Sequence, residues 1–355
     1  MSPSLSAGGV EAGPSVKIVF FGLGAVGSSL LICLAELAER DGVAAHFVVY
    51  TIDPAAARDG LFHAEHLFDR VRFVGVPGFS PVFAGEAPHD AELAGAALLV
   101  NAALPQFNCP IIELGSRLGA LTVDLASDMY DAETERTLTF AQYRHDAALR
   151  ERGAAALINL GISPGITNFL IGDHINYLWG LGRKDFEIEA VNLYLLEDID
   201  ADAVIFSWAP AVALNELSQH PLRLDQGHME TLPPFTGAGE YRFPSLLDTP
   251  YAGATHISYP TAVGAAILAW HTLGHARANP GAIKGVLTGE DLAGLLPRRR
   301  IDAVRRDLVA WGIDLFEHVR DASGVLPQDW ATGATGSGST PDDAAGALTP
   351  WSPSF

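Results

Sequence analysis

Short apolar runs alternate with helical patterns over the first half of the chain. The run Lys17–Phe21 is continuous and apolar, as expected for a parallel strand that is buried on both faces. From Ala25 to Arg40 apolar residues recur with helical spacing, and Gly42 follows at a position suited to a C-terminal cap. Five further strands are expected, with helical patterns between most of them: His46–Ile52, Val71–Val76, Ala97–Asn101, Leu121–Asp124 and Ala155–Asn159. The alternation predicts right-handed βαβ units and a doubly wound parallel sheet, an α/β fold of the Rossmann class.

The pattern changes near Arg183, where longer β-rich stretches replace the regular alternation. Strands are expected at 186–196, 204–208 and 241–243, and helices around 211–217 and 262–273. We therefore predict a second, α+β domain for substrate binding or dimerisation. The expected divisions are a flexible arm (1–15), the Rossmann domain (16–160), the α+β domain (161–290), a segment with a helix at 301–319 that packs back on the first domain (291–330), and a low-complexity, disordered tail (331–355).

The chain is acidic, with a formal net charge of −20 over 355 residues. Such a charge repels nucleic acid and anionic lipid, and it favours cationic substrates such as amines. Two cysteines cannot build a disulfide framework, the N-terminus lacks the features of a signal peptide, and no apolar run reaches the roughly 18 residues of a membrane span. We expect a cytoplasmic protein with no nucleic-acid or membrane partner.

The strongest motif is a GxGxxG sequence that directly follows the first strand and opens the first helix. Gly22 permits the tight turn, Gly24 lets the backbone approach a pyrophosphate, and Gly27 lets helix and strand pack closely. The backbone N–H groups of Ala25 and Val26 lie at the positive end of the helix dipole. The motif predicts that this turn binds a nicotinamide dinucleotide.

The choice between NAD and NADP depends on the end of the second strand. Asp53 lies near the position where an acid binds the ribose hydroxyls, which favours NAD. If Thr51 occupies that corner instead, a 2′-phosphate could fit with Arg58 as its partner. The sequence weakly favours NAD as the cofactor and does not exclude NADP.

Polar residues follow the later strands, where ligands of open α/β sheets bind. Ala103 and Leu104 are expected beside the cofactor, and Gln106 and Asn108 beside the substrate. Asp124 ends the fifth strand, where a carboxylate could hold a substrate ammonium, relay a proton or simply form a structural hydrogen bond.

The turn after the sixth strand contains Ser163-Pro164-Gly165, with Thr167 and Asn168 at the start of the following helix. We interpret it as a turn that brings Pro164 and Gly165 close to the nicotinamide, and Ser163, Thr167 and Asn168 close to the substrate. The letters also fit GxSxG, the nucleophile elbow of hydrolases. Pro164 argues against a hydrolase because proline lacks the N–H that would build the oxyanion hole.

Four further residues complete the candidate set, each with a structural alternative. Asp128 could contact the substrate, although a loop hydrogen bond is favoured for it. Trp208 offers an aromatic wall to an amine, and Glu216 follows on the next expected helix. His256 is a candidate proton donor. No combination of histidine, cysteine and carboxylate predicts a metal site.

Three segments together resemble the saccharopine dehydrogenase-like family: Leu98–Asp128, Leu157–Leu170 and Phe206–Gly227, the last followed by LPPFTGAGEYRFP. This family includes saccharopine reductase, lysine 6-dehydrogenase, carboxynorspermidine dehydrogenase and, more distantly, homospermidine synthase. The resemblance covers about residues 16–320. One departure is Ser163, where the family often has aspartate before the proline.

The resemblance implies a Rossmann domain, a second domain that often mediates dimerisation, and NAD(P)-dependent chemistry at a carbon–nitrogen bond. The leading hypothesis is therefore an oxidoreductase that reduces an imine or oxidises an amine of an amino acid or polyamine, working as a homodimer. The alternatives are a dinucleotide-binding regulatory protein without turnover and, less favoured, a serine hydrolase.

Overall fold

In a computed structural model of the chain, the structure describes residues 14–126 apart from 87, then 140–180, 222–225, 228–231, 233, 250–251, 258–313, 315, 320–321 and 324–325. Four predicted site residues lie outside this part of the chain: Asp128, Trp208, Glu216 and His256. The strands and the helix expected between 186 and 217, the strand at 241–243 and the predicted tail lie outside it as well.

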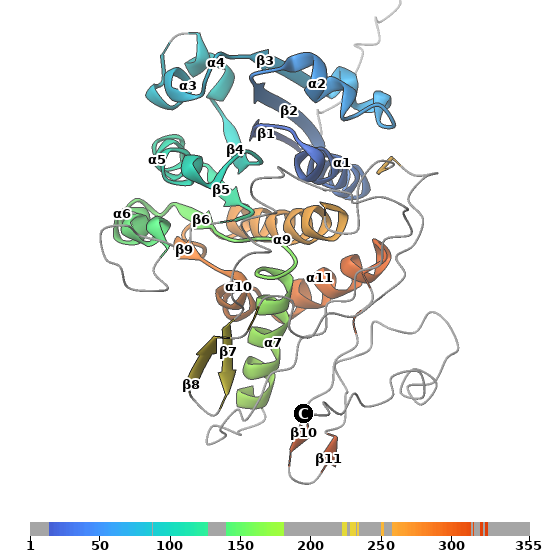
Figure 1. The fold of residues 1–355 in the computed structure, drawn as a ribbon, viewed down its shortest axis with the longest axis vertical. Coiled ribbons are helices and arrows are strands. Elements are labelled where there is room, and N and C mark those ends of the chain that lie inside the picture. Colours follow the sequence, from blue (N-terminus) through green and yellow to red (C-terminus); the bar gives the residue numbers. More distant parts are fainter. Residues whose placement is uncertain are drawn as a thin grey trace, which may run out of the picture.

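The core of the fold is a seven-stranded parallel sheet with the order β3-β2-β1-β4-β5-β6-β9 (Figure 1). Its strands are β1 (Ser15–Phe21), β2 (Ala44–Thr51), β3 (Val71–Gly75), β4 (Ala96–Asn101), β5 (Leu121–Asp124), β6 (Ala155–Leu157) and β9 (Gly285–Leu287). The predicted fold class, a doubly wound Rossmann sheet, is confirmed. All six strands expected in the first half form, each within two residues of its predicted limits.

Helices cover both faces of the sheet, which explains the continuous apolar character of the strands. They are α1 (Ala25–Arg40), α2 (Pro54–Asp59), α3 (Ser80–Ala84), α4 (His89–Leu93), α5 (Asn108–Leu118), α6 (Asp146–Arg152), α7 (Ile166–Gly180), α9 (Ser258–Ala278), α10 (Gly289–Leu295) and α11 (Arg298–Ala310). Three 3₁₀ turns lie at Glu65–Arg70, Pro105–Phe107 and Ala141–His145. Two antiparallel pairs complete the described elements, β7 (Leu222–Asp225) with β8 (His228–Thr231), and β10 (Arg320–Asp321) with β11 (Gly324–Val325).

Alternate residues of one strand serve two different hydrophobic cores. In β4, Leu98 and Val100 belong to the core beneath α1 and α9, whereas Leu99 belongs to the core beneath α3 and α5. Figure 1 shows α1 and α9 on one side of the sheet and α3 to α6 on the other. The side-chain period of two along a strand therefore anchors both helical layers.

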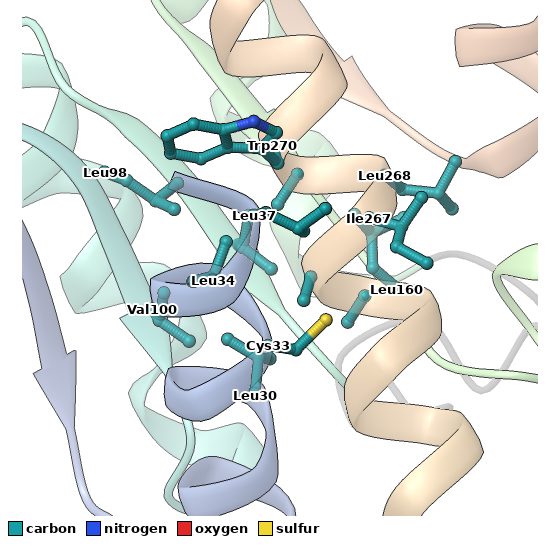
Figure 2. Packing of buried hydrophobic residues seen from close by; sticks show 14 of the residues in the cluster. Leu30, Cys33, Leu34, Leu37, Leu98, Val100, Leu160, Ile267, Leu268 and Trp270 are labelled. Atoms are coloured by element: carbon teal, nitrogen blue, oxygen red, sulfur yellow. The ribbon is translucent and has the colours of Figure 1, made fainter. Parts of the chain in front are cut away.

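The chain returns to the first sheet near its C-terminus. Strand β9 pairs in parallel with β6, and α9 packs along α1. In Figure 2, Leu34 and Leu37 of α1 lie against α9, and Cys33 is buried in the same contact. Strand β9 of the seven-stranded sheet thus lies within residues 161–290, the range predicted for the α+β domain. The wider division into domains stays a prediction.

Polar contacts fasten α11 to the same layer. Asp307 of α11 accepts hydrogen bonds from Arg40 of α1 at 2.5 Å and contacts Nε2 of His271 of α9 at 2.7 Å. The Trp270 indole donates to Asp41 at 2.8 Å.

The helix predicted at 301–319 ends earlier, at Ala310. None of the helices in the described residues is long and apolar enough to cross a membrane.

Candidate active site

The sheet order places a topological switch point between β1 and β4. From β1 the chain continues through β2 and β3 on one side, and through β4, β5 and β6 on the other. Helices that leave neighbouring strands in opposite directions open a crevice at the carboxyl ends, where ligands of such sheets bind. The predicted site residues in the described part of the chain lie at the carboxyl ends of these strands or in the connections that follow them.

The glycine turn is packed tightly at its first and last glycines and open at its middle glycine. Gly22 has a φ of 81°, and its N–H donates to the Tyr50 carbonyl at 2.8 Å. A Cβ on Gly27 would lie 2.9 Å from the Cβ of Ala102, so only glycine lets α1 approach the end of β4 this closely. A Cβ on Gly24 would meet nothing within 4 Å. The space before the helix is therefore open at the middle glycine and packed at the other two.

The first turn of α1 presents unpaired backbone donors to that space. Gly24 is the N-cap and offers no side-chain acceptor, and the first turn contains no acidic residue. The first helical hydrogen bond joins the Ser28 N–H to the Gly24 carbonyl. The N–H groups of Ala25, Val26 and Gly27 therefore have no helical partner, and with the helix dipole they suit an anion such as a pyrophosphate.

Asp53 has a structural role that the sequence did not indicate. It is the N-cap of α2, and its Oδ1 accepts hydrogen bonds from Ala55 N at 3.1 Å and Ala56 N at 3.0 Å. The neighbouring Thr51 is buried and its hydroxyl bonds to the Asp53 backbone. Arg58, the alternative partner for a 2′-phosphate, lies 4.1 Å from the ring centroid of Phe68. Asp53 thus keeps its exposed carboxylate at the end of β2, whereas the Thr51 hydroxyl is already engaged.

Asn101, the last residue of β4, was not among the predicted site residues, yet it organises the connection that follows. The Oδ1 of Asn101 accepts the Ala103 N–H at 3.0 Å, and its Nδ2 donates to the Leu104 carbonyl at 3.0 Å. The same Nδ2 donates to Oδ1 of Asn108 at 2.5 Å, and Asn108 donates to the Ala126 carbonyl at 2.8 Å. Asn108 is therefore turned inwards and buried, while Leu104 and Gln106 are exposed. Asn101 could have been recognised in the sequence, because it is a polar residue at the end of an otherwise apolar strand.

Asp124 is buried at the end of β5, with 4% of its surface exposed. Its Oδ1 accepts the Asn159 N–H at 2.8 Å, and its Oδ2 accepts a bond from Gln142 at 3.2 Å. Burial raises the pKa of Asp124 to about 7, because two hydrogen bonds replace only part of the lost hydration. The side chain can therefore hold or release a proton near neutral pH, but it is held against the turn after β6.

That turn is compact and built on glycine. Gly165 has a φ of 131°, and a Cβ there would overlap the backbone of Gly161. The Gly165 N–H donates to Oδ1 of Asn168 at 3.2 Å, and the Thr167 hydroxyl lies 3.4 Å from that of Ser163. Ser163 and Pro164 are exposed at the tip, and the bond between them is cis. Pro164 supplies no N–H after Ser163, so the hydrolase interpretation gains no oxyanion donor here.

The structure thus gathers the predicted residues that it describes along one edge, in connections after β1, β2, β4, β5 and β6. Asn101 and Asp124 are direct partners across the β4–β5 pair, which places their side-chain networks side by side. Within the described residues, no group of three or more histidine, cysteine, aspartate or glutamate side chains could hold a metal ion.

Comparisons with known proteins give a limited likeness. No protein-family model matches the chain, and no curated protein matches it. One solved structure that resembles it is apo histidine-tagged saccharopine dehydrogenase (L-Glu forming) from Saccharomyces cerevisiae, with 15% identity and a TM-score of 0.41. The match covers 64% of this chain and 47% of that protein, so the chain spans about half the length of this structural neighbour.

Proposed function

We propose that the chain is an NAD(P)-dependent oxidoreductase that acts on a carbon–nitrogen bond of an amino acid or polyamine. The observation that carries the proposal is the open N-terminus of α1 at the switch point, with Gly24 unobstructed and Gly22 and Gly27 in contact with the loop after β4. When bound, the nicotinamide supplies or accepts the hydride, while the protein supplies binding and orientation.

Different residues at the switch point would bind different parts of the dinucleotide. The backbone of Gly22, Gly24 and the first turn of α1 would bind the pyrophosphate. Asp53 would bind the adenosine ribose: its Oδ1 is engaged with the α2 cap, and its Oδ2 accepts no hydrogen bond from the described residues. Its negative charge would repel a 2′-phosphate, which supports a preference for NAD over NADP.

Two observations support amine chemistry. The segments Leu98–Asp128 and Leu157–Leu170, which carry the resemblance to saccharopine dehydrogenase-like proteins, include the loop after β4, the end of β5 and the turn after β6. These loops share one sheet edge with the glycine turn. The net charge of −20 also favours a cationic amine over a multiply anionic substrate.

On the substrate side, Ser163 and Gln106 are exposed and could hydrogen-bond a carboxylate or an amine. Thr167, Asn168 and Asp124 shape the turn that presents Ser163. We propose that Asp124 acts chiefly through Asn159, because its oxygens are buried and already accept hydrogen bonds. The roles expected for His256, Trp208, Glu216 and Asp128 stay predictions, as do the homodimer and the cytoplasmic location.

The proposal is tested by mixing the purified protein with NADH or NADPH and pairs of amines and 2-oxo acids, and following reduced-nucleotide absorbance. We expect consumption that requires both members of one pair and that is abolished in Gly24→Glu. Nucleotide binding without turnover of any pair would instead support the regulatory alternative. Ester cleavage that is lost in Ser163→Ala would contradict the proposal in favour of a hydrolase.

A further inference from the structure

Two buried amides join the connections that leave β4 and β5. Asn101 is 4% exposed and Asn108 is 3% exposed. The Asn101 amide forms three hydrogen bonds, to Ala103 N, the Leu104 carbonyl and Oδ1 of Asn108. Each bond replaces water that burial has removed, so losing one partner leaves a costly unsatisfied group. The pair therefore fixes the conformation of residues 102–107.

Residues at the start of that loop form one wall of the glycine turn. A Cβ on Gly22 would lie 3.0 Å from the Cβ of Ala103, and a Cβ on Gly27 would lie 2.9 Å from that of Ala102. The Ala102 N–H also donates to the Phe21 carbonyl at 3.0 Å, directly before Gly22. Any shift of the loop would change the space beside the first turn of α1.

The other end of the pair reaches the next strand. Asn108 begins α5 and donates to the Ala126 carbonyl at 2.8 Å, two residues after Asp124 ends β5. Asp124 in turn holds the Asn159 N–H of the turn after β6. Side-chain hydrogen bonds thus connect the ends of three neighbouring strands, from the glycine turn to the turn that carries Ser163.

We propose that Asn108 is a positioning residue: through Asn101 it holds the loop 102–107 against the glycine turn, and through the Ala126 carbonyl it fixes this loop relative to the end of β5. It contacts no ligand itself. This inference rests on the proposed function for its effect on nucleotide affinity. Its effect on the conformation of the loop is independent of that function.

The test compares Asn108→Ala with wild type in two measurements. Hydrogen exchange in the absence of nucleotide should become faster in peptides covering 102–107. NADH affinity, measured by fluorescence, should fall roughly five- to tenfold, as expected when about one net hydrogen bond no longer supports the bound geometry.

Two controls separate positioning from general destabilisation. Val304→Ala opens a cavity in the buried face of α11, far along the chain from the site, and should lower thermal stability without changing NADH affinity. Asn279→Ala removes an exposed amide near the amino end of β9, the opposite edge of the sheet, and should change neither exchange at 102–107 nor affinity.

If Asn108→Ala does not fold, Asn108→Ser takes its place in the exchange measurement, because serine is small, polar and uncharged but too short to replace both amide hydrogen bonds. Exchange at 102–107 should again be faster than in wild type. Wild-type exchange and wild-type affinity in Asn108→Ala would overturn the inference. Failure of the wild type to bind any nucleotide would instead overturn the proposed function, while the exchange result would still decide the role of Asn108.

Discussion

The Oδ1 of Asp124 accepts a 2.8 Å hydrogen bond from the backbone N–H of Asn159, a residue whose φ of 55° lies in the left-handed region. The bond joins the end of β5 to the start of the turn that leads to Ser163. A non-glycine residue with positive φ is uncommon and needs local support, which Asp124 provides. The acid predicted to act in catalysis is therefore an anchor of the turn beside the candidate site.

Asp124 should make stability depend on pH. Its pKa is raised to about 7 in the folded protein, above the ordinary 3.8. The folded state therefore binds the proton more tightly, so its contribution to stability is full below pH 3.8 and is lost as pH rises through 7. The loss is roughly 3 to 5 kcal/mol from this group alone, at about 1.4 kcal/mol per tenfold change in proton concentration.

Denaturant unfolding of wild type and Asp124→Asn at pH 5 and pH 8 measures this effect. Asparagine cannot ionise, so the stability of the variant relative to wild type should increase with pH. The exposed Asp59→Asn serves as the matched control and should track wild type. A constant difference between Asp124→Asn and wild type would contradict the assignment.

Gly27 and Gly24 should respond differently to alanine. In Gly27→Ala the new methyl would press on Ala102, and we expect a loss of roughly 1 to 3 kcal/mol in the free energy of unfolding. In Gly24→Ala the methyl enters open space, and we expect a loss of no more than about 1 kcal/mol, because alanine is a poorer N-cap than glycine. Equal destabilisation in urea titrations of the two variants would show that the turn is not packed as described.

Asp307 should be important for holding the C-terminal helices to the Rossmann core. Asp307→Ala leaves Arg40 and His271 without their shared acceptor, and we expect roughly 2 to 4 kcal/mol of destabilisation, since the Arg40 side chain is 39% exposed. Asp302→Ala on the same helix breaks an exposed pair with Arg298 and should cost less than about 1 kcal/mol. Similar unfolding midpoints for the two variants would show that the contacts of Asp307 with Arg40 and His271 do not hold α11 to the core.

Asp53 should influence the choice of nucleotide. Asp53→Asn keeps a good N-cap for α2 but removes the negative charge, so NADPH affinity should rise relative to NADH affinity by about tenfold, near 1.4 kcal/mol. Asp69→Asn, another exposed acid, is the control and should leave the ratio unchanged. An unchanged ratio in Asp53→Asn would place the ribose elsewhere.

Local patterns predicted the first six strands because each is an apolar run followed by a helix. Strand β9 (Gly285–Leu287) escaped prediction because it joins the sheet by pairing with β6, which lies far away in the sequence. Helix α9 was expected, but the extent of its burial was not. Nearly every residue from its start to Leu273 is buried, because the helix packs against α1, a contact that no local pattern contains.

In the candidate site, too, residues of a local motif were predictable, and residues that depend on distant contacts were not. Gly22, Gly24 and Gly27 were predictable because a single motif contains the strand, the turn and the helix. The inward orientation of the Asn108 side chain was not predictable, because it depends on Asn101 seven residues earlier and on Ala126, two residues after the end of β5. The double role of Asp53 likewise depends on where α2 begins, which the sequence left undefined.

Fluorescence titration with NADH and, separately, NADPH shows whether the first turn of α1 binds a nicotinamide dinucleotide. We predict saturable binding of at least one nucleotide, with NADH preferred, and loss of binding in Gly24→Glu, whose carboxylate would occupy the open space before the helix. Absence of binding by the native protein, or undiminished binding by a folded Gly24→Glu variant, would show that the first turn of α1 is not a dinucleotide site.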